Sequence, residues 1–195
     1  MPAQRTSEAF EQALLPHLDA AYNLARWLTR NEHDAQDVVQ EAYLRALRFF
    51  GGFRGADARA WLLKIVRNVF YTSRTQNRRN ETAETFDEEI HSTAAHSVNP
   101  ERLTLQNADG QMLRQALDEL PCNFREVLVL RELEGLSYKE IAGVTNLPIG
   151  TVMSTLSRAR DRLRRDLIAA RQKNAQGRVE VLRGAVSRVR AAAAS

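Results

Sequence analysis

Residues 136–163 read LSYKEIAGVTNLPIGTVMSTLSRARDRL, and this stretch predicts two helices joined by a tight turn. Ser137 followed three residues later by Glu140 is the sequence signature of a capping box, so a short helix is expected to begin there. Residues 146–148, Asn-Leu-Pro, supply a turn, and a longer helix is expected over about 149–168. Two helices with such a turn, the second of them basic, are typical of a helix-turn-helix DNA reader.

The longer of these helices separates its side chains into two faces when it is plotted at 100° per residue. An apolar stripe is expected to pack on the preceding helices, and it consists of Val152, Leu156, Ala159 and Leu163. The opposite face carries Ser154, Ser157, Arg158, Asp161 and Arg165, with Thr151 and Met153 at its edges. Hydroxyl side chains followed by arginine suit a helix whose first turns enter the major groove. A polar surface helix in an ordinary bundle is the alternative, and the capping box and the turn favour DNA reading over it.

A further helix is expected just before this motif. Pro121 opens the segment CNFREVLVLREL, and Gly135 ends it in the manner of a C-terminal glycine cap. Apolar residues also recur at helical spacing through 10–30, 34–50 and 59–72, and strand-like alternation is absent. The sequence therefore predicts an all-α protein.

The chain divides by composition into four parts. Residues 1–74 and 108–170 are expected to form two small helical domains, the second a helix-turn-helix domain. Residues 75–107 are polar and acidic and are expected to form a flexible linker. Residues 171–195 hold six basic residues against one acidic residue, within a net charge of +4 for all 195 residues. For this tail, a frayed or disordered extension and a short amphipathic helix both remain open.

The segment 34–48, DAQDVVQEAYLRALR, has the pattern of an amphipathic helix. A buried stripe is expected from Val38, Val39, Ala42, Ala46 and Leu47, and an exposed face from Asp37, Gln40, Glu41 and Arg45, with Leu44 beside it. An acidic face next to an apolar residue suits docking on a basic helical partner. Taken alone, the segment fits a solvated amphipathic helix better.

Aromatic, amide and basic residues interleave in the next segment. A glycine-rich loop carries Phe53 and Arg54, and the helix after it presents Trp61, Lys64, Arg67, Asn68, Tyr71 and Arg74. Such side chains can stack on unpaired bases and hold phosphates. The other interpretation makes the aromatic residues core and the arginines surface, and for Trp61 the two are evenly matched.

Several function classes find no support. No apolar run approaches the length of a membrane span, and the N-terminus lacks the layout of a secretory signal, so we expect a cytoplasmic protein with no direct membrane insertion. Cys122 is the one cysteine, and the four histidines have no metal-site spacing, so no metal or cofactor is expected. No nucleophile–base constellation or phosphate loop indicates an enzyme.

The segments DAQDVVQEAYLRAL, FRGADARAWLLKIVRN and LPCNFREVLVLRELEGLSYKEIAGVTNLPIGTVMSTLSRARDRLR together resemble the sigma-70 family, specifically its small extracytoplasmic-function group. The likeness covers about residues 8–79 and 108–168, in the order of that family. It implies a transcription initiation factor that binds core RNA polymerase, through the beta-prime clamp and the beta subunit, and directs it to promoter DNA. It also implies a stress or envelope response and inhibition by a cognate anti-sigma factor.

Site residues carry over from this resemblance by position. The polymerase-binding positions fall on Asp37, Gln40, Glu41 and Leu44. Those that read the −10 element fall on Phe53, Arg54, Trp61 and Asn68. Those that read the −35 element fall on Met153, Ser154, Ser157 and Arg158, with Arg131 and Tyr138 near the phosphates. The alternative function is a helix-turn-helix regulator that is not a polymerase subunit, and binding to core polymerase without DNA separates the two.

Overall fold

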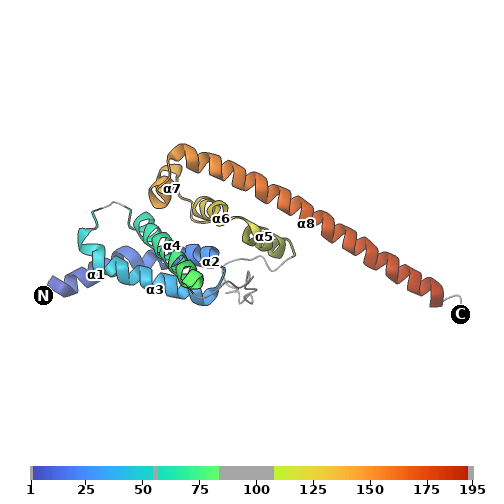
Figure 1. Cartoon of the computed structure of the whole chain (residues 1–195), viewed down its shortest axis with the longest axis horizontal. Helices are drawn as coiled ribbons and strands as arrows, with labels where there is room; N and C mark the ends of the chain where they lie inside the picture. The colour runs from blue at the N-terminus through green and yellow to red at the C-terminus, as the bar shows by residue number, and fades with distance from the viewer. Residues whose placement is uncertain (1, 55–56, 84–107, 193–195) are drawn as a thin grey trace.

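A computed structural model describes residues 2–54, 57–83 and 108–192, with side chains placed within 8–54, 57–76 and 110–173. Every regular element over these residues is a helix, and none of them forms a strand. The predicted all-α class is therefore confirmed. The described helices fall into an N-terminal half before residue 84 and a C-terminal half after residue 107 (Figure 1).

The N-terminal half consists of α1 (Pro2–Leu14), η1 (Leu15–His17), α2 (Leu18–Thr29), α3 (Glu32–Phe49), η2 (Phe50–Gly52) and α4 (Ala58–Ala83). Helices α2, α3 and α4 pack against one another around a buried apolar core. Polar residues set where the helices begin. The Asn31 side chain accepts hydrogen bonds from the backbone of His33 and Asp34 to start α3, and Asp57 accepts one from the Ala60 N–H at the start of α4.

The C-terminal half consists of α5 (Ala108–Glu119), α6 (Cys122–Leu128), the π-helical turn η3 (Val129–Leu133), α7 (Tyr138–Thr145) and α8 (Ile149–Ala192). Pro121 precedes α6, and Gly135 takes a left-handed φ of 67° after η3, as the sequence predicted. Helix α8 packs on α5, α6 and α7 through its first turns. The sequence analysis did not foresee this π turn, which is a rare feature of helices.

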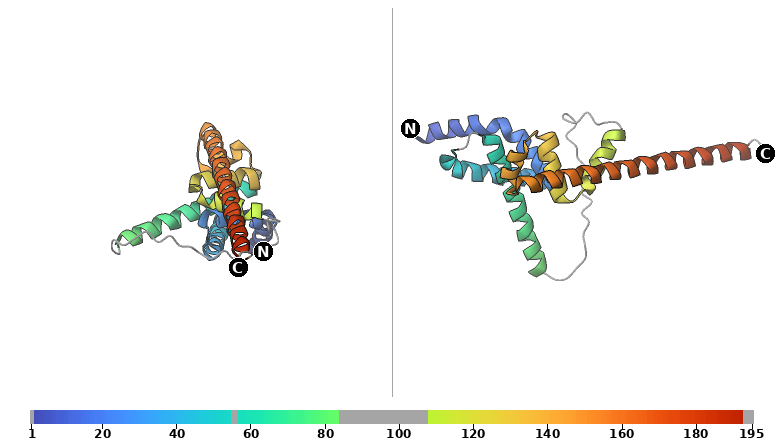
Figure 2. Two further views of the ribbon diagram at one scale, coloured as in Figure 1. Left: turned by 90° about the vertical axis from the view of Figure 1, so that its right-hand side faces the viewer. Right: turned by 90° about the horizontal axis from the view of Figure 1, so that it is seen from above.

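Two helices run further than the sequence suggested. Helix α4, expected over 59–72, continues to Ala83, so the first nine residues of the expected linker are helical. The rest of that linker lies outside the described residues. Helix α8 continues through the basic tail to Ala192, so the tail is helical up to that point. Both helices extend beyond the packed part of the molecule (Figure 2).

The two halves pack against each other. Helix α4 lies against α7, and α2 lies against α6 and η3. Buried apolar residues of both halves, including Leu24 and Leu62 from the first and Leu120 and Ile141 from the second, belong to one continuous core. The sequence predicted the helices of each half but not their association.

Candidate nucleic-acid interface

The helix-turn-helix is built by local signals that the sequence showed. The Ser137 hydroxyl accepts a hydrogen bond from the Glu140 N–H at 3.2 Å, and the Glu140 carboxylate accepts one from the Ser137 N–H at 2.6 Å. This reciprocal capping box starts α7, and these hydrogen bonds hold the pKa of Glu140 below its ordinary value. Asn146 ends α7 with a left-handed φ of 56°, and α8 begins three residues later. The predicted α7, the turn after it and the predicted start of α8 are confirmed.

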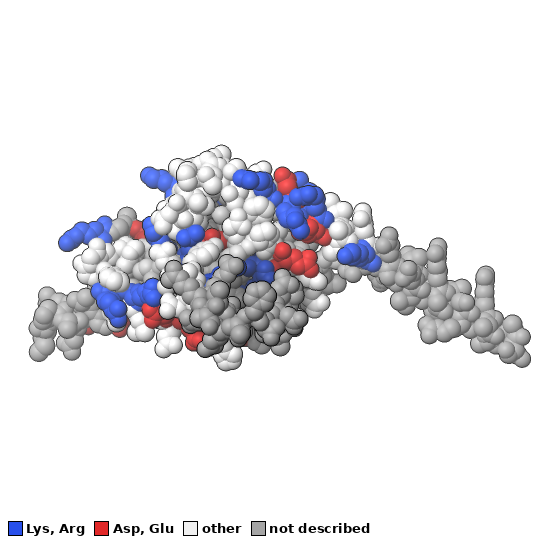
Figure 3. Space-filling model, viewed as in Figure 1, with Lys and Arg blue, Asp and Glu red and all other residues white. Residues whose placement is uncertain are grey.

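Helix α8 has the two faces that the helical wheel predicted. Val152, Leu156 and Ala159 are buried, and Leu163 is half-buried against the same core. The outward face exposes Met153, Ser154, Ser157 and Arg158. Lysine and arginine side chains gather along this helix, with a few carboxylates among them (Figure 3). The arrangement leaves small polar side chains and an arginine free to enter a groove.

Arg158 is held close to its own helix. Its guanidinium donates to the backbone carbonyl of Ser154 at 3.2 Å and to the Ser154 hydroxyl at 3.3 Å. These bonds lie at the surface, where exchange for a phosphate or a base edge costs little. Ser154 therefore positions the guanidinium over the first turns of α8.

The two residues expected near phosphates form a unit at the base of α7. The Arg131 guanidinium donates to the Leu136 carbonyl at 2.7 Å and lies 4.9 Å from the centre of the Tyr138 ring. Arg160, on α8, forms an exposed ion pair with Glu132 at 2.6 Å beside this unit. The structure thus brings Arg131 and Tyr138 together, next to α8.

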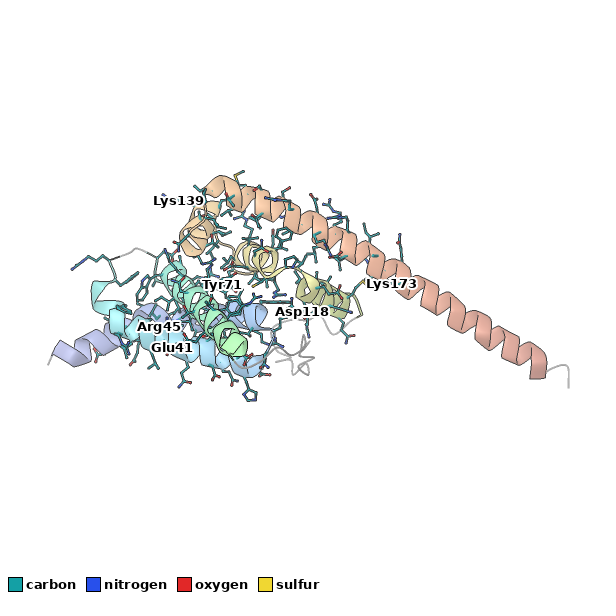
Figure 4. The ribbon with its side chains drawn as sticks, viewed as in Figure 1. Glu41, Arg45, Tyr71, Asp118, Lys139 and Lys173 are labelled. Atoms are coloured by element: carbon teal, nitrogen blue, oxygen red, sulfur yellow. The ribbon has the colours of Figure 1, made fainter. Side chains whose placement is uncertain are left out.

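The four residues expected to dock on polymerase lie on α3. Asp37, Gln40 and Leu44 are exposed, Leu44 at 54%, and Glu41 is half-exposed. Glu41 forms an ion pair with Arg45 at 2.6 Å, one turn further along the helix, and the two side chains lie together in Figure 4. The face therefore exists as predicted, with one of its carboxylates partly neutralised by its neighbour.

One assignment on α3 was wrong. Leu47 was expected in the buried stripe but is 50% exposed, as is its neighbour Phe49 at 61%. Leu47 lies at the edge of the stripe. The exposed apolar surface of α3 therefore includes Leu47 and Phe49 as well as Leu44.

The residues expected to read an unpaired strand divide into two groups. Phe53 and Trp61 are half-buried, with ring centres 4.7 Å apart, in a cluster that also includes Phe50 and Phe10. Arg54 and Asn68 are exposed. Trp61 thus contributes to packing while its ring remains partly accessible, which combines the two interpretations left open by the sequence.

Two further residues of α4, Arg67 and Tyr71, form hydrogen bonds with the C-terminal half. The Arg67 Nε donates to the Glu126 carboxylate at 2.6 Å, and the Tyr71 hydroxyl donates to its other oxygen at 3.1 Å. The Arg67 guanidinium also lies 4.6 Å from the centre of the Tyr71 ring. Figure 4 shows Tyr71 on α4, beside the C-terminal half. In this arrangement neither side chain is available to DNA.

Burial sets the ionisation of this cluster. Glu126 is 2% exposed, and desolvation raises the pKa of its carboxyl, while the charge and hydrogen bond of Arg67 and the hydrogen bond of Tyr71 oppose the rise. Desolvation and the charge of Glu126 also raise the pKa of the Tyr71 hydroxyl. The hydroxyl therefore remains a donor, and the carboxylate keeps two donors that come from the other half of the chain.

A second set of contacts crosses between the halves nearby. Arg59 of α4 forms an ion pair with Glu134, which is 5% exposed, and Asn23 of α2 donates to the same carboxylate at 3.5 Å. Arg30, in a left-handed conformation at φ 60°, donates to the Leu120 carbonyl at 3.4 Å. Sequence reasoning missed these residues, although Glu126 and Glu134, two of the three glutamates in the largely apolar segment 122–134, were a signal that cations from elsewhere in the chain would meet them.

Neither a metal centre nor a membrane span emerges from the described residues. Their histidine, cysteine and carboxylate side chains form no cluster of three that would hold a metal ion. Over the same residues, no helix combines the length and the apolar character that crossing a bilayer requires.

Family models match both halves of the chain. Residues 14–80 match the model of Sigma-70 region 2, and residues 110–163 match that of Sigma-70, region 4. The first match spans α2 to α4 and includes the residues expected to dock on polymerase and to read an unpaired strand, and the second spans the helix-turn-helix. The order of the two agrees with the resemblance seen in the sequence.

Curated relatives point the same way. The chain is 34% identical over 161 residues to the ECF RNA polymerase sigma factor SigE of Mycolicibacterium smegmatis, covering 83% of this chain and 62% of that protein. It is 35% identical over 162 residues to the RNA polymerase sigma-H factor of Pseudomonas aeruginosa, covering 78% and 83%. It is 37% identical over 135 residues to the ECF RNA polymerase sigma-E factor of Escherichia coli, covering 66% and 71%.

Solved structures share the fold. The sigma factor RpoE from Bartonella quintana, crystallised with the anti-sigma factor NepR, has a TM-score of 0.68 and 32% identity, covering 82% of this chain and 97% of that one. CnrH in complex with the cytosolic domain of CnrY has a TM-score of 0.56 and 26% identity, covering 86% and 94%.

Proposed function

The chain belongs to the extracytoplasmic-function group of the sigma-70 family, and we propose that it binds core RNA polymerase and directs it to a set of promoters. The observation that carries this proposal is the outward face of α8, with Met153, Ser154 and Ser157 ahead of Arg158 on a correctly capped helix-turn-helix. Catalysis belongs to the polymerase. This subunit supplies binding energy and promoter selection in the cytoplasm.

Each of three surfaces has a separate role in the proposed function. The face of α8 reads the −35 element, and Arg131 and Tyr138 lie beside the phosphates. The α3 face, with Asp37, Gln40, Glu41 and Leu44, docks on the clamp of the polymerase. The partly accessible rings of Phe53 and Trp61, with exposed Arg54 and Asn68, read and open the −10 element. Stacking of unpaired bases on such rings is worth about 1–3 kcal/mol per base.

An anti-sigma factor is the further partner that we propose. The support comes from two solved relatives, RpoE with NepR and CnrH with the cytosolic domain of CnrY, each bound to an inhibitor or partner chain in its structure. Immunoprecipitation from unstressed cells tests this part. Recovery of one stoichiometric partner that blocks binding to core polymerase supports the proposal, and its absence in stressed and unstressed cells alike contradicts it.

Binding to core polymerase in the absence of DNA tests the main proposal against the alternative of a helix-turn-helix regulator. The wild-type chain should form a stable complex. The double variant Asp37→Lys/Glu41→Lys should bind more weakly with its helical content intact, because like charges would face a basic partner. Arg162→Glu, on the exposed part of α8, is a charge-reversal control away from the α3 face and should bind as the wild type does. If the folded double variant binds core polymerase as well as the wild type does, the α3 face is not the docking surface.

A further inference from the structure

The start of α8 carries no charged side chain, and two of its residues expose large apolar side chains. Residues 149–157 read IGTVMSTLS, and the charged part of the helix begins with Arg158. Ile149 is 47% exposed and Met153 is 51% exposed. Figure 3 shows an uncharged surface over this end of α8, with lysine and arginine side chains on both sides of it. The end of the helix that is expected to enter the groove therefore presents apolar surface within basic surroundings.

The exposed face of α8 is divided into an apolar flank and a polar flank. At 100° per residue, Ile149 and Met153 lie one turn apart and about 40° from each other, whereas Ser154 and Arg158 lie about 100–180° away from them. On the polar flank, the Ser154 hydroxyl donates to the Thr151 carbonyl at 3.1 Å and accepts from Arg158 at 3.3 Å. The apolar flank offers no hydrogen-bonding group at Ile149 or Met153, so what it binds must be apolar as well.

The size and surroundings of the apolar flank indicate what covers it. A stable protein interface buries about 800 Å² and about 20–30 residues on each partner, which is far more than two side chains supply. The exposed residues Arg158, Arg160 and Arg164 follow on the same helix and favour a polyanion. The apolar group that a base edge presents in the major groove is the C5-methyl of thymine. A thymine methyl therefore matches the apolar flank in both size and setting.

We propose that Ile149 and Met153 bind thymine methyl groups in the −35 element, so that the two flanks of α8 read different bases. The inference rests on the proposed function, which places α8 in the major groove. Cytosine has no methyl group and presents an amino donor, which would lie beside these side chains without an acceptor. Arg158 on the polar flank suits guanine, whose O6 and N7 accept a bidentate pair. The element is expected to hold thymine opposite one flank and guanine opposite the other.

Selection from a library of random duplexes, by the chain bound to core polymerase, identifies the element. The enriched duplexes should hold thymine at fixed positions of the −35 element. Uracil then replaces thymine at one position at a time, which removes the methyl and leaves the base pair unchanged. Burying one methyl group is worth about fourfold in affinity, so each replacement at a position that is read should weaken binding about fourfold. Replacement of a thymine between the two promoter elements is the control and should have no effect.

Met153→Ala and Ile149→Ala assign the methyl groups to side chains. Each variant should bind the thymine duplex about fourfold more weakly and should lose its sensitivity to uracil at one position. Met153→Leu keeps an apolar side chain and should retain that sensitivity. Ile168→Ala is the matched control, because Ile168 is 50% exposed on the same helix but lies about 28 Å further along its axis. This variant should show the sensitivity of the wild type.

The outcomes separate this inference from the proposed function. Enriched elements without thymine would overturn the inference and leave the function standing. The same holds if uracil weakens binding equally in the wild type and in both alanine variants, because the methyl group would then act through the shape of the duplex. If the chain with core polymerase enriches no duplex at all, the proposed function is wrong and the inference is wrong with it.

Discussion

The outward face of α8 and the contact between the two halves use arginine in opposite environments. Arg158 is exposed and donates to Ser154 of its own helix, whereas Arg67 is largely buried and paired with Glu126 of the other half. An exposed arginine exchanges a local bond for a phosphate at little cost, but a buried pair must be separated and rehydrated. The comparison teaches that positive charge does not by itself identify candidate DNA-binding arginines in this chain, because burial decides which arginines are available.

The largest effect is expected from Glu126→Ala. It leaves Arg67 buried beside Tyr71 without its carboxylate. The closed form, in which the two halves are packed together, should lose about 3–5 kcal/mol relative to an open form, in which they are apart. Small-angle X-ray scattering should show an expanded chain. The double variant Arg67→Met/Glu126→Leu replaces the pair by apolar side chains and should stay closed. A compact Glu126→Ala chain would show that the buried pair does not hold the halves together.

Arg158→Ala tests the exposed side of the comparison. We expect a loss of about 1–3 kcal/mol in binding to a duplex with the cognate −35 element, the scale of one good base or phosphate contact. The free energy of unfolding should change by less than about 0.5 kcal/mol, because the side chain is exposed. Arg162→Ala, an exposed arginine further along α8 that pairs with Asp166, is the control and should bind the duplex nearly as the wild type does. An equal loss in both variants would mean that α8 binds by charge alone.

A smaller effect is expected from a change in the capping box of α7, the helix that packs against both α4 and α8. Ser137→Ala removes one bond of the capping box and should lower the free energy of unfolding by about 1 kcal/mol. Chemical denaturation of the full chain measures it. Ser157→Ala, at an exposed position inside α8, should change that free energy much less, and similar losses in the two variants would contradict the structural role given to the cap.

The smallest effect concerns pH. Burial raises the pKa of Glu126, so this carboxyl binds a proton more readily in the closed form than in the open form, where its pKa returns to the ordinary range. Closure therefore takes up protons, and the closed form should gain stability as the pH falls from neutrality towards the ordinary carboxyl range and lose it as the pH rises. The open population should change by less than about tenfold between pH 7 and pH 5. Glu126→Gln should lose this dependence in scattering measurements, and an identical pH profile in the variant would assign it elsewhere.

The sequence predicted best what neighbouring residues determine. The capping box of Ser137, the turn at Asn146 and the stripe of Val152, Leu156 and Ala159 are all local, so the helix-turn-helix followed from spacing alone. The exposed face of α3 followed in the same way, except that Leu47 lies at the edge of the apolar stripe and is exposed.

What escaped prediction depends on contacts between distant residues. Arg67 and Glu126 are 59 positions apart, and Arg59 and Glu134 are 75 positions apart, so no periodicity connects them. Arg67 and Tyr71 looked like strand-reading residues because their spacing is the same whether they face DNA or another helix. The resemblance to a family supplied the reading positions, and only the packing of the two halves distinguished the available side chains from the engaged ones.

Run-off transcription with core RNA polymerase, with the start sites mapped, tests the central claim most directly. The account predicts transcripts that require the chain and begin at a defined distance from a shared −35 element. At saturating chain, Arg158→Ala should reduce them about tenfold, in line with the lost contact, while Glu134→Gln should leave them undiminished. Transcription that is independent of the chain, or an equal reduction by both variants, would contradict the division between an exposed face proposed to read DNA and a buried contact between the halves.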